Sequence, residues 1–93
     1  FHSQGEELYY SYGEDTPACS PFIAQMLAAS CGYTLCDPTG ASAYAGLKDW
    51  FIHAFKRPGF TIEIGRGENP LPIQELEPIY ARLLEMMILA VII

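Results

Sequence analysis

The stretch Phe60-Thr61-Ile62-Glu63-Ile64, with the loop 65–72 (GRGENPLP) after it, decides the fold class of this chain. Its β-branched and aromatic residues alternate in a way that predicts a β-strand. Glu63 is the odd member, because it places an acid inside an apolar strand. An edge strand that turns the carboxylate to solvent explains Glu63 as well as a functional acid does.

Helical patterns lie on both sides of this strand in the sequence. Ser20-Pro21 is typical of an N-cap followed by the first helical residue, and Gly32 is typical of a C-cap. Apolar residues at helical spacing predict a second helix over 47–55 and a closing helix over 74–93. The expected apolar face of the closing helix comprises Leu76, Ile79, Tyr80, Leu83, Met86 and Met87.

The remaining segments predict few further strands. Residues 1–12 indicate the end of a strand, an active-site turn and a second short strand, whereas residues 33–43 predict a loop rich in Gly, Pro, Ser and Thr. Two or three strands that alternate with helices give an α/β fold class. Because so few strands make a poor sheet, we expect 1–93 to be one incomplete domain that completes a larger sheet. An exposed sheet edge would then invite self-association.

Composition and charge exclude several classes of protein. The chain has 93 residues, of which 51% are hydrophobic and 17% charged, so it is globular rather than disordered. With a net charge of −6 and only five Lys and Arg, it lacks the cation clusters that nucleic acids and anionic membranes require. The apolar run 86–93 is shorter than the roughly 20 residues of a membrane span.

The chain opens on Phe1 without an initiator Met or a signal-peptide pattern. We therefore expect a piece of a longer protein, and the sequence assigns no compartment. The three cysteines, Cys19, Cys31 and Cys36, are an odd number without a disulfide framework or a zinc-knuckle spacing. We expect reduced thiols, with Cys19 and Cys31 packed as small apolar residues.

Three residues stand out as candidates for chemistry: His2, Lys48 and Glu63. A histidine and a glutamate brought together suit metal-assisted hydrolysis, in which the metal polarises a carbonyl and the carboxylate moves a proton. Each residue also has a structural explanation, since a lone histidine is more often structural and a helical lysine is ordinarily solvated. Residue type alone therefore leaves the function open.

Three motifs together resemble the second half of the zinc carboxypeptidase family: residues 1–7 (FHSQGEE), 46–50 (GLKDW) and 60–65 (FTIEIG). The resemblance extends over the whole chain, including the turn 69–72 and the closing helix, and points to the bacterial branch with γ-D-glutamyl-L-diamino acid peptidases of cell-wall peptides. It implies the C-terminal part of a carboxypeptidase-type mixed sheet flanked by helices, of phosphorylase/hydrolase-like architecture. It also implies zinc as cofactor and a peptide as substrate.

The resemblance assigns roles to four residues. His2 matches the third zinc ligand of the family, and Ser3 matches a residue whose backbone lines the substrate site. Glu63 matches the general base that activates the zinc-bound water and then protonates the leaving amine. Lys48 matches the base of the specificity pocket, where a cation suggests a substrate with an acidic group.

The sequence departs from the family pattern at two points. The mobile tyrosine of the family is replaced by Ala41, and neither Tyr33 nor Tyr44 is assigned its role. The H-x-x-E motif with the other two zinc ligands, and the arginines that hold the substrate, are missing. The other histidine, His53, has no glutamate at the required spacing, so we expect it on a helix surface.

One histidine and one glutamate cannot close a catalytic zinc site, which takes three protein ligands. We therefore expect the chain to be inactive alone and to need the N-terminal half of the peptidase domain as a partner. A non-catalytic remnant, or a stand-alone binding or structural domain on the same half-fold, is the alternative. The intact His2, Lys48 and Glu63 favour the enzyme part. Whether the parent trims a C-terminal residue or cuts within a peptide is left open.

Overall fold

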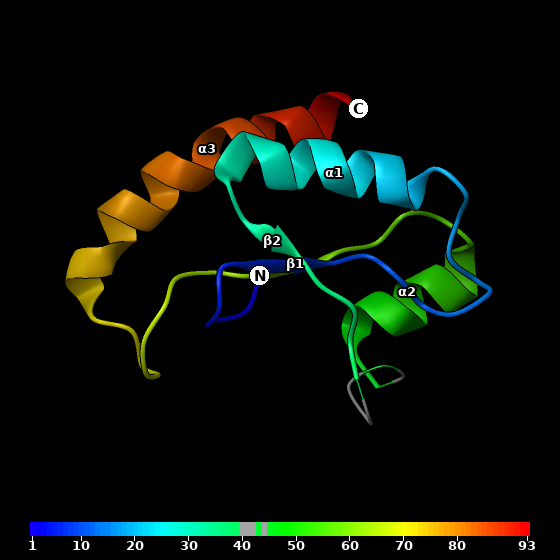
Figure 1. Cartoon of the computed structure of the whole chain (residues 1–93), viewed down its shortest axis with the longest axis horizontal. Helices are drawn as coiled ribbons and strands as arrows, with labels where there is room; N and C mark the ends of the chain where they lie inside the picture. Colours follow the sequence, from blue (N-terminus) through cyan, green and yellow to red (C-terminus); the bar gives the residue numbers. More distant parts are fainter. Residues whose placement is uncertain (40–42, 44) are drawn as a thin grey trace.

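Short strands and helices alternate along the part of the chain that this computed structural model describes, residues 1–39, 43 and 45–93 (Figure 1). The strands are β1 (Glu7–Tyr9), β2 (Thr34–Leu35) and β3 (Thr61–Glu63). The helices are α1 (Ser20–Cys31), α2 (Leu47–Phe55) and α3 (Leu76–Ile92), with a 3-10 turn over Ile73–Glu75 before α3.

The described strands form one mixed sheet in the order β2-β1-β3. The central strand β1 is parallel to β2, with Glu7 opposite Thr34, and antiparallel to β3, with Glu7 opposite Glu63. This arrangement confirms the α/β class.

The N-terminal residues add a further pairing on the other side of β3. His2 forms an isolated parallel bridge with Glu63, in which the His2 amide donates to the Ile62 carbonyl (2.8 Å) and the Ile64 amide donates to the His2 carbonyl (2.7 Å). The chain therefore runs along one side of β3, crosses over its end and returns along the other side as β1. Glu63 thus has a backbone neighbour on each side, although β3 is the outer strand of the three-stranded sheet.

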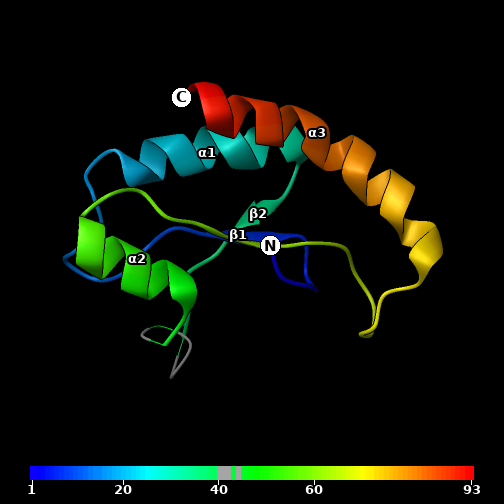
Figure 2. The same cartoon turned by 180° about the vertical axis from the view of Figure 1, so that it is seen from behind.

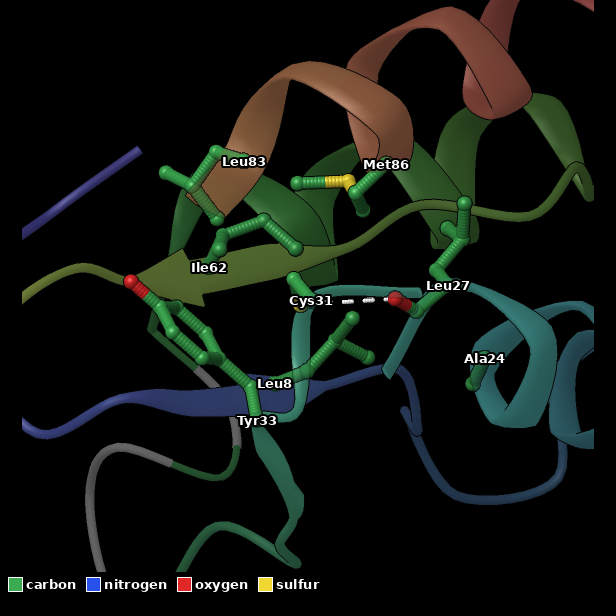
Figure 3. Packing of buried hydrophobic residues seen from close by; sticks show 8 residues of the cluster. All are labelled: Leu8, Ala24, Leu27, Cys31, Tyr33, Ile62, Leu83 and Met86. Carbon is green, nitrogen blue, oxygen red and sulfur yellow. Dashed lines mark hydrogen bonds between the residues drawn. The ribbon is translucent and has the colours of Figure 1, made fainter. Parts of the chain in front are cut away.

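The core lies between one face of the sheet and two helices. Figures 1 and 2 show α1 and α3 side by side over this face, with α2 on the other side of the sheet. Leu8 and Ile62 point from the sheet toward the helices (Figure 3). Because successive strand residues alternate, the side chains of Glu7, Tyr9 and Glu63 face the side of α2. The rest of the buried cluster is Ala24, Leu27, Cys31, Tyr33, Leu83 and Met86.

The helix ends confirm most of the predicted boundaries. Helix α2 has the expected bounds, and Gly32 ends α1 with φ 74° and an amide bond to the Ala28 carbonyl. The prediction that Ser20 is an N-cap was wrong. Its amide already donates to the Pro17 carbonyl (3.0 Å), so the turn starts one residue earlier and Cys19 is the N-cap residue.

Two predictions need correction, one about a loop and one about the apolar face of α3. The segment 33–43 is not all loop, because its start pairs with β1 as β2, a strand too short to show alternation in the sequence. On α3, Leu83 and Met86 are buried as expected, but Leu76 and Tyr80 are 60% and 55% exposed. The first turns of α3 extend beyond the end of α1, so no helix covers them there (Figure 1).

The cysteines are free, as expected, but only two of them avoid solvent. Cys31 is buried in the core, where its thiol contacts the Leu27 carbonyl, and Cys36 is partly buried. Cys19 is exposed at the start of α1, so its predicted packing was wrong. In the described part of the chain, every helix is too short or too polar to cross a membrane.

Candidate functional site

A cavity of about 410 Å³ lies between the polar face of the sheet and the start of α2. Its volume falls within the range of pockets that hold small ligands. Among the described residues, its walls are formed by His2, Tyr9, Pro38, Ala45, Gly46, Lys48, Asp49, Thr61 and Glu63. The cavity therefore brings together His2, Lys48 and Glu63, the three residues selected from the sequence.

His2 and Glu63 form the centre of this site. Residues that pair across strands point to the same face, and the His2 Nδ1 atom lies 3.5 Å from Glu63 Oε1. The His2 side chain is 64% exposed, whereas that of Glu63 is 19% exposed. The arrangement sets a sheltered carboxylate beside an imidazole that solvent, or another part of a larger protein, can reach.

Lys48 is buried in the wall of the cavity, with its side chain 4% exposed. The explanation that it is a solvated lysine on the outer helix face was therefore wrong. Its ammonium donates to the Ser11 carbonyl (2.5 Å) and to Asp49 Oδ1, while Asp49 Oδ2 accepts the Gly46 amide (2.9 Å) at the start of α2. An ammonium has three donors, and these two acceptors take two of them within the described part of the chain.

Tyr9 is a pocket residue that the sequence reasoning missed. Its hydroxyl donates to Glu7 Oε2 (2.5 Å), and this bond, with burial, raises the pKa of Tyr9 to about 12. Burial, with the neighbouring Glu7 carboxylate, also raises the pKa of the Cys36 thiol. The alternation of Glu7 and Tyr9 around the apolar Leu8 was the signal in the sequence that could have placed Tyr9 on the face of Glu63.

Ser3 lies beside the site rather than in its described lining. Its hydroxyl donates to Asn69 Oδ1 (2.8 Å), and its carbonyl accepts a bond from Asn69 Nδ2 (3.1 Å). These bonds join the segment after His2 to the loop after β3. The assignment of Ser3 to substrate binding stays a prediction.

Of the two tyrosines considered from the sequence, Tyr33 is the one that the structure describes. Tyr33 is 6% exposed in the core under the helices, and its hydroxyl accepts the Gly65 amide (3.4 Å). It therefore lies on the face of the sheet away from the cavity. Positions Ala41 and Tyr44 are outside the described residues.

His53 lies on the helix surface, as predicted, with its side chain 68% exposed. Its Nδ1 atom is 2.7 Å from Asp15 Oδ2, and Lys56 Nζ is 2.6 Å from Asp15 Oδ1. The hydrogen bond from Lys56, and after it the one with His53, lowers the pKa of Asp15. The cluster ties the segment after β1 to the C-terminal end of α2.

The described residues do not by themselves fit a zinc ion. They contain no group of three or more His, Cys, Asp and Glu side chains that could hold a metal. His2 and Glu63 supply at most two donor groups, and a catalytic zinc needs three protein ligands.

Comparison with known proteins finds that this chain is similar in sequence to part of two longer proteins. It is 43% identical over 81 residues to gamma-D-glutamyl-L-diamino acid endopeptidase 1 of Lysinibacillus sphaericus, covering 86% of this chain and 20% of the relative. It is 38% identical over 79 residues to the uncharacterized protein YqgT of Bacillus subtilis (strain 168), covering 85% of this chain and 21% of the relative. The chain thus spans about a fifth of the length of these curated relatives. No family model and no solved structure matches it.

Proposed function

We propose that this chain is the C-terminal part of a zinc-dependent, carboxypeptidase-type peptidase that hydrolyses peptide bonds in cell-wall peptides. The observation that carries the proposal is the placement of His2 and Glu63, 3.5 Å apart, in the wall of one cavity with Lys48. The name of one relative, a gamma-D-glutamyl-L-diamino acid endopeptidase, supports the peptidase class and a peptide with an acidic group as substrate.

In this proposal Glu63 is the general base. Its carboxylate is mostly sheltered, is fixed on a strand and opens on the cavity, so it can take a proton from an attacking water and pass it to the leaving amine. The exposed imidazole of His2 would be one zinc ligand. The other two would come from protein outside these 93 residues, so the chain alone is inactive.

The cavity also indicates how a peptide would be held. The third donor of the buried Lys48 ammonium would serve a carboxylate of the substrate, and Tyr9 and Thr61 line the space between Lys48 and Glu63. A peptide with an acidic group is therefore the proposed substrate. Ser3 would act on the substrate only through its backbone.

The test is Glu63→Gln in the full natural protein that contains this sequence, with the exposed Glu85→Gln on α3 as the matched control. Loss of general acid–base catalysis should lower kcat roughly 10²–10⁴-fold and leave the bound zinc in place. Glu85→Gln should keep the kcat of the wild type. A Glu63→Gln protein with near-normal kcat would show that Glu63 is structural. A wild-type protein that cleaves no γ-D-glutamyl peptide would favour the non-catalytic binding domain instead.

A further inference from the structure

Residues 3–6 form a short crossover between the two segments that flank Glu63. His2 pairs with Glu63 on one side of β3, and Glu7 pairs with the same residue on the other side. The Gly5 amide donates to the Gly65 carbonyl (2.6 Å), which fixes the middle of the crossover to the end of β3. The crossover therefore connects directly the two segments that pair with Glu63.

Glu6 combines an unfavourable backbone conformation with side-chain hydrogen bonds to a residue of α3. Its φ of 55° lies in the left-handed region, which is unfavourable for a residue with a side chain. Both oxygens of its carboxylate accept bonds from Arg82 Nη1, at 2.8 and 2.7 Å. Charge-assisted bonds of this kind are stronger than neutral ones, so they can hold the crossover in this conformation.

Arg82 is itself held from two further directions. Its Nε donates to the Cys31 carbonyl (2.7 Å) and its Nη2 to the Gly32 carbonyl (3.3 Å), at the C-terminal end of α1. Its guanidinium also lies 5.2 Å from the centre of the Tyr33 ring. Because a guanidinium is planar and its donors have fixed directions, Arg82 can hold Glu6 in a fixed position relative to the end of α1 better than a flexible lysine could.

We infer that Arg82, acting through Glu6, is a positioning residue that sets the relative placement of His2 and Glu63. Helices α1 and α3 pack on the far side of the sheet from the cavity, and the Arg82–Glu6 contact joins α3 to the crossover. The expected effect of this contact on catalysis rests on the proposed function. Its effect on the conformation of residues 3–6 does not. Arg66 also approaches Glu6, at 3.4 Å, but its side chain is 75% exposed and makes a looser contact.

Hydrogen–deuterium exchange of the full natural protein, followed by mass spectrometry, tests the effect on the conformation of residues 3–6. Glu6→Gln keeps the shape of the side chain but loses the charge, and it leaves Arg82 bonded to Cys31 and Gly32. Exchange in peptides over 2–7 should rise on the order of tenfold, while peptides over 20–31 should keep the wild-type rate. Arg66→Met is the matched control and should leave both regions unchanged.

The second variant and the kinetics complete the test. Arg82→Lys should raise exchange over 2–7 and also at the end of α1, because a lysine cannot serve both partners. In peptide hydrolysis, Glu6→Gln should lower kcat on the order of tenfold with little change in KM. Unchanged exchange over 2–7 in Glu6→Gln, or an equal rise over 20–31, would overturn the inference. A wild type without hydrolysis would overturn the proposed function alone, because the exchange measurement still decides the positioning.

Discussion

His2 and Glu63 face each other across a parallel bridge, in which the amide and the carbonyl of His2 pair with the backbone of β3 and the two side chains lie 3.5 Å apart. The pair does not depend on attraction between imidazole and carboxylate, since strand pairing already brings the residues together. In the proposed function, the exposed nitrogen of His2 would supply one ligand of a zinc site whose other ligands come from protein outside these 93 residues.

The first prediction follows from that incomplete site. Purified alone, the 93-residue chain should not bind zinc tightly, because His2 would be the one histidine ligand that it supplies to the proposed centre. Isothermal titration at neutral pH measures this binding. A one-to-one sub-micromolar site that disappears in His2→Ala would contradict the prediction.

The second prediction concerns the core that carries the strand β1. Leu8 is fully buried between the sheet and the helices, so Leu8→Ala should reduce the free energy of unfolding by about 2–5 kcal/mol. Leu47 is 73% exposed, and Leu47→Ala should change the same free energy by less than about 0.5 kcal/mol. Urea denaturation of the two variants measures both values. Equal losses would show that Leu8 is not a core residue in solution.

Local patterns in the sequence predicted which segments are helices and strands better than they predicted which strands pair with one another. The strand around Ile62 and the helix 47–55 were found because alternation and helical spacing are properties of a few adjacent residues. The two residues of β2 were missed, because pairing with β1 over a long separation makes them a strand.

The sequence singled out candidate site residues but not how they lie relative to one another, and their roles stay predictions. His2, Lys48 and Glu63 stood out by residue type, the family resemblance gave them roles, and the structure brings them to one cavity. The burial of Lys48 against Asp49 depends on tertiary packing that overrides the usual solvation of a helical lysine. Tyr9 was missed because local alternation places it on the face of Glu7, whereas the register that brings this face beside Glu63 depends on long-range strand pairing.

The third prediction concerns the titration of Tyr9. Its pKa is raised to about 12 because Glu7 accepts its proton in a hydrogen bond and burial disfavours the phenolate. The hydrogen bond from protonated Tyr9 to Glu7 stabilises the fold below the ordinary tyrosine pKa near 10, and this contribution is lost as the pH rises through about 12. Glu7→Gln should bring the pKa down toward 10, as measured by ultraviolet absorbance of the phenolate. Tyr9→Phe identifies the signal, and the same titration curve in Glu7→Gln and wild type would contradict the assignment.

The fourth prediction concerns Asp15 and acid stability. Lys56, and then His53, lower the pKa of Asp15 in the folded state. The contacts of ionised Asp15 with Lys56 and His53 therefore stabilise the fold above the ordinary pKa of aspartate. This contribution is lost as the pH falls through the lower pKa of the folded state. Asp15→Asn should lower the urea midpoint at pH 6, and the difference from the wild type should disappear at low pH and shrink in high salt.

The exposed Glu14→Gln is the control for the Asp15 experiment, because it removes an acid from the same segment. It should leave the midpoint of the wild type nearly unchanged across the pH range. If Glu14→Gln and Asp15→Asn behave alike, the general charge of the segment is responsible rather than the contact of Asp15 with Lys56.

The last prediction concerns substrate preference and Lys48. The ammonium is buried in the cavity wall, where Asp49 balances its charge and the Ser11 carbonyl takes a second donor. A substrate carboxylate can still take the third donor, and a charge-assisted bond in a partly desolvated site favours it over an apolar group. A cationic group would meet a like charge and be rejected. Because Asp49 already neutralises part of the field, we expect a preference on the order of tenfold.

The measurement is kcat/KM of the full natural protein on matched peptides that carry an acidic, an apolar or a basic residue beyond the cut. Lys48→Met keeps most of the apolar stem and removes the charge, so the acidic peptide should lose its advantage while the apolar one keeps its rate. Lys56→Met is the matched control, because Lys56 lies just past the end of the same helix and contacts Asp15 outside the cavity. That variant should rank the three peptides as the wild type does. If Lys48→Met also keeps the wild-type ranking, the ammonium serves only to join α2 to the segment of Ser11, and the acidic group of the substrate is bound elsewhere.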